Sequence, residues 1–133
     1  MFKRRKTQTP LTTEPTVYPD GVCVETPQGV YLIKGQKRYR VPTQRILDSW
    51  GFPLIVQTTE EALRHYKVAA RLGFRDGSLI YNIADGKMYL VSNNKRRHIT
   101  SPDALELLGI DRSRVVNVSN FEINLQQLGE DII

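Results

Sequence analysis

The pattern of apolar and polar positions along this chain occurs twice. When the chain is displaced by 58 residues, Tyr31–Phe52 aligns with Tyr89–Ile110, and both segments carry an aliphatic run, a Lys-Arg pair, a leucine and a glycine. At a displacement of 56 residues, Asp20-Gly21 aligns with Asp76-Gly77. The two displacements imply that one turn is two residues longer in the second copy. The sequence therefore predicts two related units in tandem.

Each unit is expected to begin with three short strands and to continue with a helix. Runs of β-branched residues predict the strands, and Gly, Asn and Asp pairs predict tight turns between them. A Ser or Thr N-cap and a glycine bound the helix, and a short apolar strand and a second capped helix follow. The strands are predicted at 22–26, 30–34 and 38–41, and at 78–83, 87–91 and 96–99; the short strands at 54–56 and 115–116; and the capping boxes at Thr58/Glu61 and Ser119/Glu122.

These elements predict an α+β fold in three parts. Residues 1–17 are expected to form a flexible basic arm rich in Thr and Pro, residues 18–74 the first unit, and residues 75–133 the second. Each unit is a three-stranded antiparallel meander followed by a short helix, a short strand and a second short helix. In the helix of the second unit, Leu105, Leu107 and Leu108 are expected to belong to the buried stripe.

The positive charge of the chain is concentrated at its beginning. The chain has 19 Lys and Arg residues against 14 acidic residues, and the basic excess comes from Lys3, Arg4, Arg5 and Lys6. Such an arm either contacts a phosphate-bearing or acidic surface or is simply solvated. No apolar segment follows these basic residues, so we expect no secretory signal, and no apolar run is long enough for a membrane span.

Residues that commonly perform catalysis are sparse. His65 and His98 fall at non-equivalent positions of the two units, and Cys23, the only cysteine, lies between two valines and is expected in the core. The sequence contains no phosphate-binding loop, no hydrolase elbow and no paired-cysteine metal site. Asp20 and Asp76 are expected to form turns. We therefore predict no enzyme activity, no metal or cofactor, and no small-molecule substrate.

The repeated basic strands are the candidate contact surface. Alternation along the second of them places Lys95 and Arg97 on one face and Arg96 and His98 on the other. These side chains can cover the module with their aliphatic stems and protect a sheet edge, or they can bind nucleic acid or an acidic partner. The exposed aromatic rows that accompany single-strand binding are missing. The candidate contacts, besides the arm, are Lys37, Arg38, Arg40, Lys95, Arg96 and Arg97.

The segment Y-L-V-S-N-N-K-R-R-H-I-T-S, which begins at Tyr89, resembles a short repeat found in tandem in many bacterial surface proteins. That repeat consists of a tyrosine, an aliphatic pair, an asparagine, Lys-Arg, an aliphatic residue and a serine or threonine. The match covers Tyr89–Ile110 well and Tyr31–Phe52 less well, because Gly35 replaces the asparagine. The motif marks a module and implies no particular activity.

Longer stretches of the second unit, L-G-F-R-D-G-S-L-I-Y-N and V-S-N-F-E-I-N-L-Q-Q-L-G-E, are similar to small virion structural proteins of tailed phages that infect actinobacteria. The resemblance implies a head, neck or tail component that is made in the host cytoplasm and assembles in many copies with other virion proteins. Its arm would reach a neighbouring subunit or packaged DNA. One alternative is a cell-envelope or glycan-binding module, which predicts exposed Tyr31 and Tyr89. The other is a small non-specific nucleic-acid-binding protein, whose affinity would fall steeply with salt.

Overall fold

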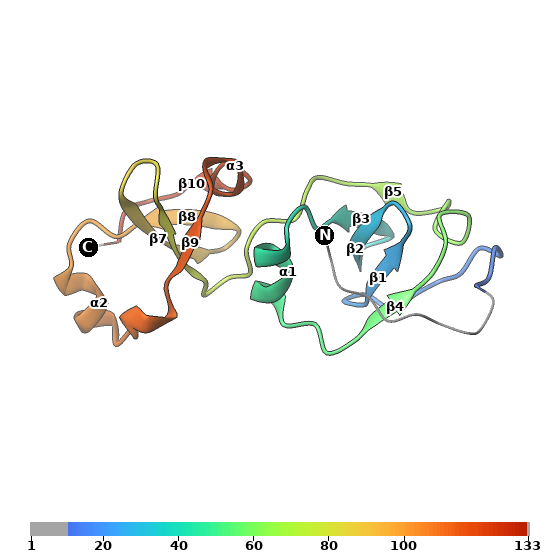
Figure 1. Cartoon of the computed structure of the whole chain (residues 1–133), viewed down its shortest axis with the longest axis horizontal. Helices are drawn as coiled ribbons and strands as arrows, with labels where there is room; N and C mark the ends of the chain where they lie inside the picture. Colours follow the sequence, from blue (N-terminus) through green and yellow to red (C-terminus); the bar gives the residue numbers. More distant parts are fainter. Residues whose placement is uncertain (1–10, 133) are drawn as a thin grey trace. The chain divides into compact units, whose positions relative to one another are not determined.

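The chain folds into two compact units. The computed structural model describes residues 11–132, so the basic residues Lys3 to Lys6 of the predicted arm lie outside the described residues. The units divide between Leu72 and Gly73, close to the predicted boundary after residue 74. Each unit contains a five-stranded mixed sheet and short helical segments, which confirms the predicted α+β fold of two related tandem units (Figure 1).

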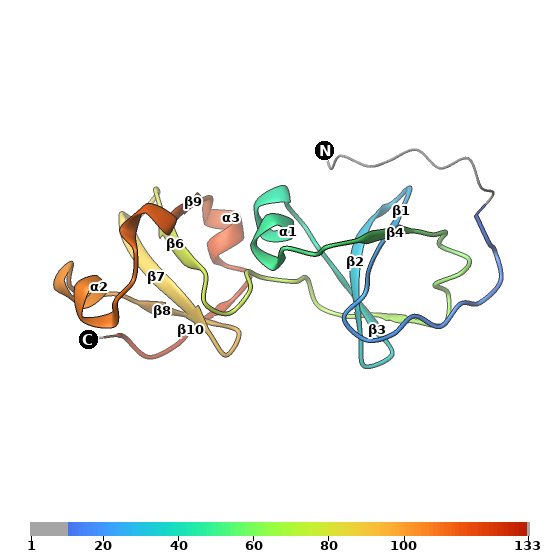
Figure 2. The same ribbon diagram turned by 90° about the horizontal axis from the view of Figure 1, so that it is seen from below.

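The described residues of the first unit form five strands and one helix. They are β1 (Cys23–Thr26), β2 (Gly29–Lys34), β3 (Lys37–Arg40), α1 (Gln44–Trp50), β4 (Ile55–Gln57) and β5 (Lys67–Val68). Strands β1, β2 and β3 form the predicted antiparallel meander. Strand β4 pairs in parallel with β1, and β5 pairs in parallel with β3, so the strand order is β4-β1-β2-β3-β5 (Figures 1 and 2).

The second unit repeats this topology with two additional helical segments. Its elements are β6 (Leu79–Asn82), β7 (Lys87–Ser92), β8 (Lys95–His98), α2 (Asp103–Leu108), η1 (Arg112–Arg114), β9 (Val116–Val118), α3 (Asn120–Ile123) and β10 (Gln127–Leu128). The strand order is β10-β8-β7-β6-β9. Read in reverse, this order matches that of the first unit, with β9 in the place of β4 and β10 in the place of β5. Strands β6, β7 and β8 form the meander, while β9 and β10 pair in parallel with β6 and β8.

The turns agree with the sequence predictions. Residues 27–28 connect β1 to β2, and residues 83–86 connect β6 to β7, which is the predicted difference of two residues. Both β2–β3 and β7–β8 turns have positive φ, at 58° and 61° in Gly35-Gln36 and at 50° and 59° in Asn93-Asn94. Glycine and asparagine tolerate this conformation best. Asp20 and Asp76 accept hydrogen bonds from these turns, at the N–H of Gly35 (3.1 Å) and of Asn94 (2.9 Å).

The first helix of each unit ends at the predicted glycine, but only α1 has the predicted N-cap. In the second unit Pro102 is the N-cap of α2 and makes no side-chain capping hydrogen bond, while the predicted capping residue Ser101 accepts from the N–H of Asp103 at 3.2 Å. The Thr43 hydroxyl accepts a hydrogen bond from the N–H of Ile46 at 3.3 Å. Gly51 and Gly109 end α1 and α2 in the left-handed region, with φ of 59° and 69°. In α2, however, Leu107 is 83% exposed and Leu108 is 47% exposed, so the prediction that both belong to the buried stripe was wrong. The helix has only six residues and reaches the core through Ala104 and Leu105.

The second predicted helix exists only in the second unit. There the capping box is confirmed, because Ser119 and Glu122 each accept from the backbone N–H of the other. In the first unit, residues 60–65 form turns, and the capping hydroxyl belongs to Thr59, which accepts from the N–H of Ala62 at 3.1 Å. The predicted box at Thr58 and Glu61 was therefore wrong by one residue. Strand pairing shows that this half of the unit repeats at 60 residues, since Val56 and Val116 hold equivalent positions.

Two apolar clusters hold the sheets to the segments that cover them. The cluster of the first unit joins β1 and β2 to the loop before β5, and that of the second joins the sheet to α2 and to the C-terminal segment. They consist of Val24, Tyr31, Ile33, Leu63 and Tyr66, and of Leu79, Ile99, Ala104, Leu105 and Ile132.

A buried side chain just before the last strand of each unit binds the backbone just before the first strand. In the first unit, the Tyr66 hydroxyl accepts from the N–H of Tyr18 at 2.8 Å and donates to its carbonyl at 3.4 Å. In the second, Gln126 Oε1 accepts from the N–H of Phe74 at 3.1 Å, and Gln126 Nε2 donates to its carbonyl at 2.9 Å. We call each pair of hydrogen bonds the backbone clasp. Different side chains thus perform the same task at equivalent positions.

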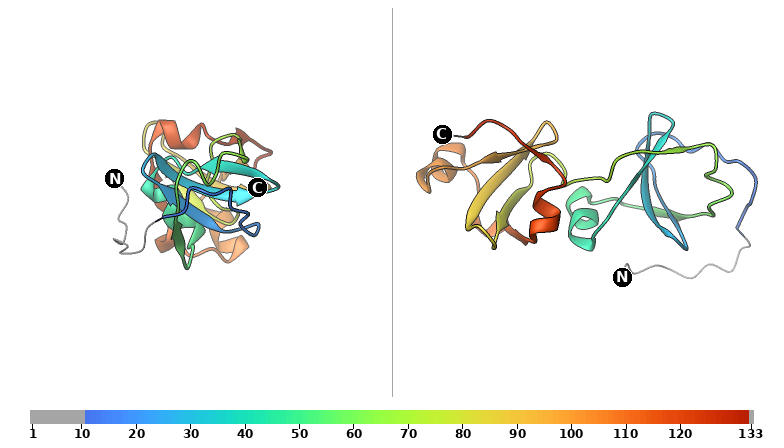
Figure 3. Two further views of the ribbon diagram at one scale, coloured as in Figure 1. Left: turned by 90° about the vertical axis from the view of Figure 1, so that its right-hand side faces the viewer. Right: turned by 90° about the horizontal axis from the view of Figure 1, so that it is seen from above.

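The described end of the predicted arm contacts the first unit. The N–H of Thr16 donates to the carbonyl of Ala62 at 3.1 Å, and the Thr59 hydroxyl donates to the carbonyl of Thr12 at 2.7 Å. Arg64 adds a hydrogen bond to the carbonyl of Thr13 at 2.9 Å. Residues 11–18 therefore run beside the loop between β4 and β5 (Figure 3, right).

The clasp of the second unit predicts a large effect of one side chain on stability. Gln126→Ala leaves the N–H and the carbonyl of Phe74 buried without these partners, which should lower the free energy of unfolding by roughly 2–4 kcal/mol. Urea denaturation followed by circular dichroism measures this loss. Gln127→Ala is the matched control, because Gln127 is exposed on β10. Equal stability of the two variants would contradict the role of the clasp.

Gly73 should be coupled to the same clasp. A Cβ atom at Gly73 would lie 2.4 Å from Cδ of Gln126, so Gly73→Ala must displace the glutamine side chain. We expect Gly73→Ala to destabilise the wild-type chain and to cost much less in a Gln126→Ala background. A double-mutant cycle in urea measures the coupling. Additive effects would show that Gly73 acts independently of Gln126.

Candidate functional site

The predicted basic strands are not sheet edges. β3 and β8 each have a meander strand on one side and a short parallel strand on the other, because β5 and β10 cover their outer sides. The interpretation that their Lys and Arg residues protect an exposed edge was therefore wrong. The outermost strands are β4, β5, β9 and β10.

The arginine of the repeated Lys-Arg pair stacks on the repeated tyrosine. The Arg38 guanidinium carbon lies 4.9 Å from the ring centroid of Tyr31, and that of Arg96 lies 5.1 Å from the ring of Tyr89. Such distances give a favourable cation–π contact. His98 also contacts the Tyr89 ring, at 5.6 Å between centroids, so Arg96 and His98 share one face as predicted. The tyrosine and the arginine of the motif therefore stabilise the module itself.

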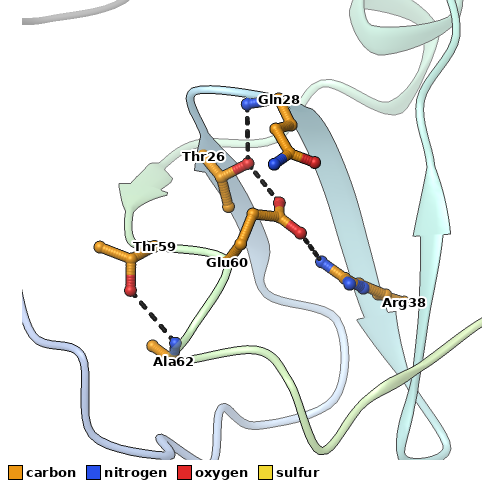
Figure 4. A network of polar contacts seen from close by, with 6 residues as sticks. All are labelled: Thr26, Gln28, Arg38, Thr59, Glu60 and Ala62. Atoms are coloured by element: carbon orange, nitrogen blue, oxygen red, sulfur yellow. Dashed lines mark hydrogen bonds and ion pairs between the residues drawn. The ribbon is translucent and has the colours of Figure 1, made fainter.

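Arg38 also belongs to a polar network in the first unit (Figure 4). Arg38 Nη1 lies 2.7 Å from Glu60 Oε1, with the two side chains 12% and 21% exposed. The Thr26 hydroxyl donates to the other oxygen of Glu60 and accepts from the N–H of Gln28. Burial alone would raise the pKa of Glu60, but the hydrogen bonds from Thr26 and Arg38 and the charges of Arg38 and Arg40 outweigh it and lower that pKa from its ordinary value of 4.5.

The equivalent network of the second unit contains no carboxylate. Asn82 and Asn120 occupy the positions of Thr26 and Glu60, and their side-chain amides lie 3.5 Å apart. Arg96 Nε donates instead to the backbone carbonyl of Gln126 at 3.1 Å. Arg96 therefore contacts the Tyr89 ring and a carbonyl oxygen, and it forms no ion pair with another described residue.

The other predicted contact residues lie in different surroundings. The Arg40 guanidinium lies over Gly29, with its carbon 3.2 Å from where a Cβ of that glycine would be. Lys95 and Arg97 both pack against Gly129, which confirms that they share a face, and Arg97 Nε donates to the carbonyl of Glu130 at 3.0 Å. Lys37 and Lys95 are exposed. The six predicted residues thus do not converge on one surface in either unit.

The aromatic residues of the motif are buried. Tyr31 is 5% exposed and Tyr89 is 3% exposed, and burial together with nearby Asp85 raises the pKa of Tyr89. The glycan-binding alternative requires both rings at the surface to stack on sugars, and these rings are not available for that contact.

The single cysteine of the chain lies in the core of the first unit. Cys23 is 1% exposed, as predicted for a core residue, and burial with the nearby charge of Glu25 raises the pKa of its thiol to about 12. Such a thiol is a poor nucleophile. Within residues 11–132, no group of three His, Cys, Asp or Glu side chains could hold a metal ion. No helix in that range is long and apolar enough to cross a membrane.

The second unit contains a groove at its surface. It is an open hollow of about 500 Å³ lined by residues of β6, β7, β8, α2 and the connection to β9. Its apolar lining comes from the core cluster and the residues packed on it, and two cations also line it. The apolar residues are Met88, Ile99, Leu105 and Val115, and the cations are Lys87 and Arg112.

The sequence motif did not reveal this groove, because its cations lie where the two units differ. Lys87 occupies the position of Gly29 in the first unit. Arg112 lies in η1, within a connection from Gly109 to Val115 that is two residues longer than the connection from Gly51 to Ile55. The sequence therefore indicated these two cations only as positions where the second unit departs from the first.

Comparisons with known proteins identify no family. No family model matches the chain, and no curated protein matches it. Among solved structures, the chain is similar to a component of "the periplasmic assembly from the ESX-5 inner membrane complex", with a TM-score of 0.35 and 9% sequence identity. The match covers 90% of this chain and 42% of that chain, so this chain spans less than half the length of the protein it matches. At this TM-score the likeness carries no assignment of fold or function.

The Glu60 network predicts how the first unit responds to acid. Because the pKa of Glu60 is lower in the folded state, its carboxylate stabilises the fold above the unfolded pKa, and that stability is lost as pH falls through the folded pKa. We expect Glu60→Gln to lower the melting temperature at neutral pH and to have little effect well below pH 4.5. Melting curves between neutral and acidic pH measure this difference.

Glu61→Gln is the matched control, because Glu61 is the neighbouring carboxylate and is exposed. Its melting temperature should follow that of the wild type throughout. A pH-independent difference between Glu60→Gln and the wild type would show that the network acts through shape and not through the charge of Glu60.

Proposed function

We propose that this chain is a non-enzymatic structural component of a tailed-phage virion that acts through protein–protein contacts. The observation that supports a contact protein is the exposure of adjacent leucines on α2. Leu107 is 83% exposed and Leu108 is 47% exposed, although both lie in the part of the repeat that predicts burial. Adjacent exposed leucines are typical of a surface that another chain covers.

The arrangement of the basic motif supports the same proposal. Arg38 and Arg96 make their contacts within their own units, with Tyr31, Tyr89, Glu60 and the carbonyl of Gln126. A polyanion site would instead present such arginines together on an open face. The arginine and tyrosine of the motif therefore stabilise the module, and the exposed leucines of α2 remain available for contact with another chain.

The virion assignment comes from the resemblance of the second unit to small phage structural proteins. A small module that joins a symmetric assembly needs only weak contacts, because many copies bind at once. Two such units in one chain provide two different surfaces from one fold.

The test is affinity capture of the tagged chain from its native lysate, followed by mass spectrometry. We expect head, neck or tail proteins in stoichiometric amounts, and we expect Leu107→Ser/Leu108→Ser to lose them because the apolar contact is removed. The matched control is Leu54→Ser in the first unit, because the exposure of Leu54 (66%) lies between those of Leu107 and Leu108. Wall material or nucleic acid in place of structural proteins would overturn the proposal.

A further inference from the structure

We infer that the groove of the second unit binds an acidic peptide segment of a neighbouring protein chain, with apolar side chains on its floor and carboxylates at Lys87 and Arg112. The inference rests on the proposed function, because a chain that acts through protein contacts needs a surface that recognises another chain. It adds to that function the place of the contact and the chemistry of the partner.

The floor of the groove suits apolar side chains. Ile99 and Leu105 belong to the core cluster, and Met88 and Val115 pack against it while remaining partly exposed. Methionine adapts its shape to different apolar partners. The hollow of about 500 Å³ is within the range of sites that hold a ligand, and its open shape allows a chain to pass through it.

The charge of the groove favours carboxylates. Lys87 and Arg112 are both exposed, and neither side chain forms an ion pair or hydrogen bond with another described residue. The groove contains no acidic lining residue. Arginine pairs with carboxylates through two parallel hydrogen bonds, so a segment with acidic residues beside an apolar one complements this lining.

The acidic residues next to these cations are occupied elsewhere. Asp85 accepts hydrogen bonds from the backbone N–H of Lys87 at 2.8 Å and from the Tyr89 hydroxyl at 3.3 Å. Asp111 accepts from the backbone N–H and the hydroxyl of Ser113, at 2.9 and 2.8 Å. These two carboxylates accept hydrogen bonds within their own turns and from Tyr89, and neither forms an ion pair with Lys87 or Arg112. The two cations can therefore bind an external anion.

The first unit has a different lining at the corresponding positions. Gly29 replaces Lys87, and the connection that carries Arg112 is shorter by two residues. The Arg40 guanidinium lies over Gly29, where the second unit has His98 and Lys87. The inferred recognition therefore belongs to the second unit, and the first unit serves as an internal comparison.

A display library of random peptides, selected against the full-length chain, tests the inference. We expect enrichment of sequences with acidic residues flanking an apolar residue. The enriched peptides should bind the wild-type chain in fluorescence anisotropy, more weakly at raised salt, and at least about tenfold more weakly to Lys87→Glu/Arg112→Glu. Each variant is first checked for an unchanged melting temperature, and single charge reversals replace the double variant if it unfolds.

Lys34→Glu/Lys67→Glu is the matched control, because it makes the same change in net charge at exposed positions of the first unit. It should bind the peptides like the wild type. No acidic enrichment, or equal loss in both double variants, would overturn the inference. A competition experiment gives a further outcome. If inorganic phosphate or an anionic oligosaccharide displaced the bound peptides at a lower concentration than a second acidic peptide does, the inference would also be overturned, because the groove would then recognise another class of anion.

The assay also separates this inference from the proposed function. Peptide binding by the isolated chain does not require a virion. If capture yields no virion proteins while the peptides still bind at Lys87 and Arg112, the virion assignment fails and the groove assignment stands. If virion proteins are captured equally well by Lys87→Glu/Arg112→Glu, the groove is not the contact that joins the assembly.

Discussion

The backbone clasp is the constraint on which the rest of each unit depends. The outermost strands β5 and β10 have only two residues, so they contribute few hydrogen bonds of their own. The residue just before each of them is anchored by two hydrogen bonds to the backbone at the start of the unit. A tyrosine hydroxyl makes both bonds with one oxygen, at 2.8 and 3.4 Å, whereas a glutamine amide uses two atoms, at 3.1 and 2.9 Å.

Anchoring these short strands determines the surroundings of the basic motif. Because β5 and β10 lie against β3 and β8, the motif arginines become half-buried and must find partners within the unit. The tyrosine ring supplies one partner in both units. The first unit adds the carboxylate of Glu60, and the second adds the carbonyl of Gln126, the same residue that forms its clasp. The clasp and the motif therefore stabilise one another in the second unit.

Local chemistry made most of the fold predictable from the sequence. The hairpin turns, the Thr43 cap and the glycine helix stops each follow from conformational preferences of one or two residues. The sequence did not predict β5 and β10, because a strand of two residues is too short to show an alternation of apolar and polar positions. The clasp was missed because Tyr66 and Gln126 share no chemistry that a comparison of the repeats can detect. The second capped turn was misplaced because Thr58 and Glu61 match the capping-box pattern in the sequence, whereas the repeat distance of 60 in this half of the unit makes Thr59 the equivalent of Ser119.

The repeated motif could not reveal the candidate contact surface, because the motif contains only residues that the two units share. The tyrosine and the arginine that recur in both units make their contacts inside the module, whereas the recurring Lys37 and Lys95 are exposed. A contact specific to one unit must depend on positions where the units differ. Lys87 and Arg112 meet this condition, since one replaces a glycine and the other lies in the longer connection. In a chain built from two related modules, the departures from the repeat therefore indicate function better than the repeat itself.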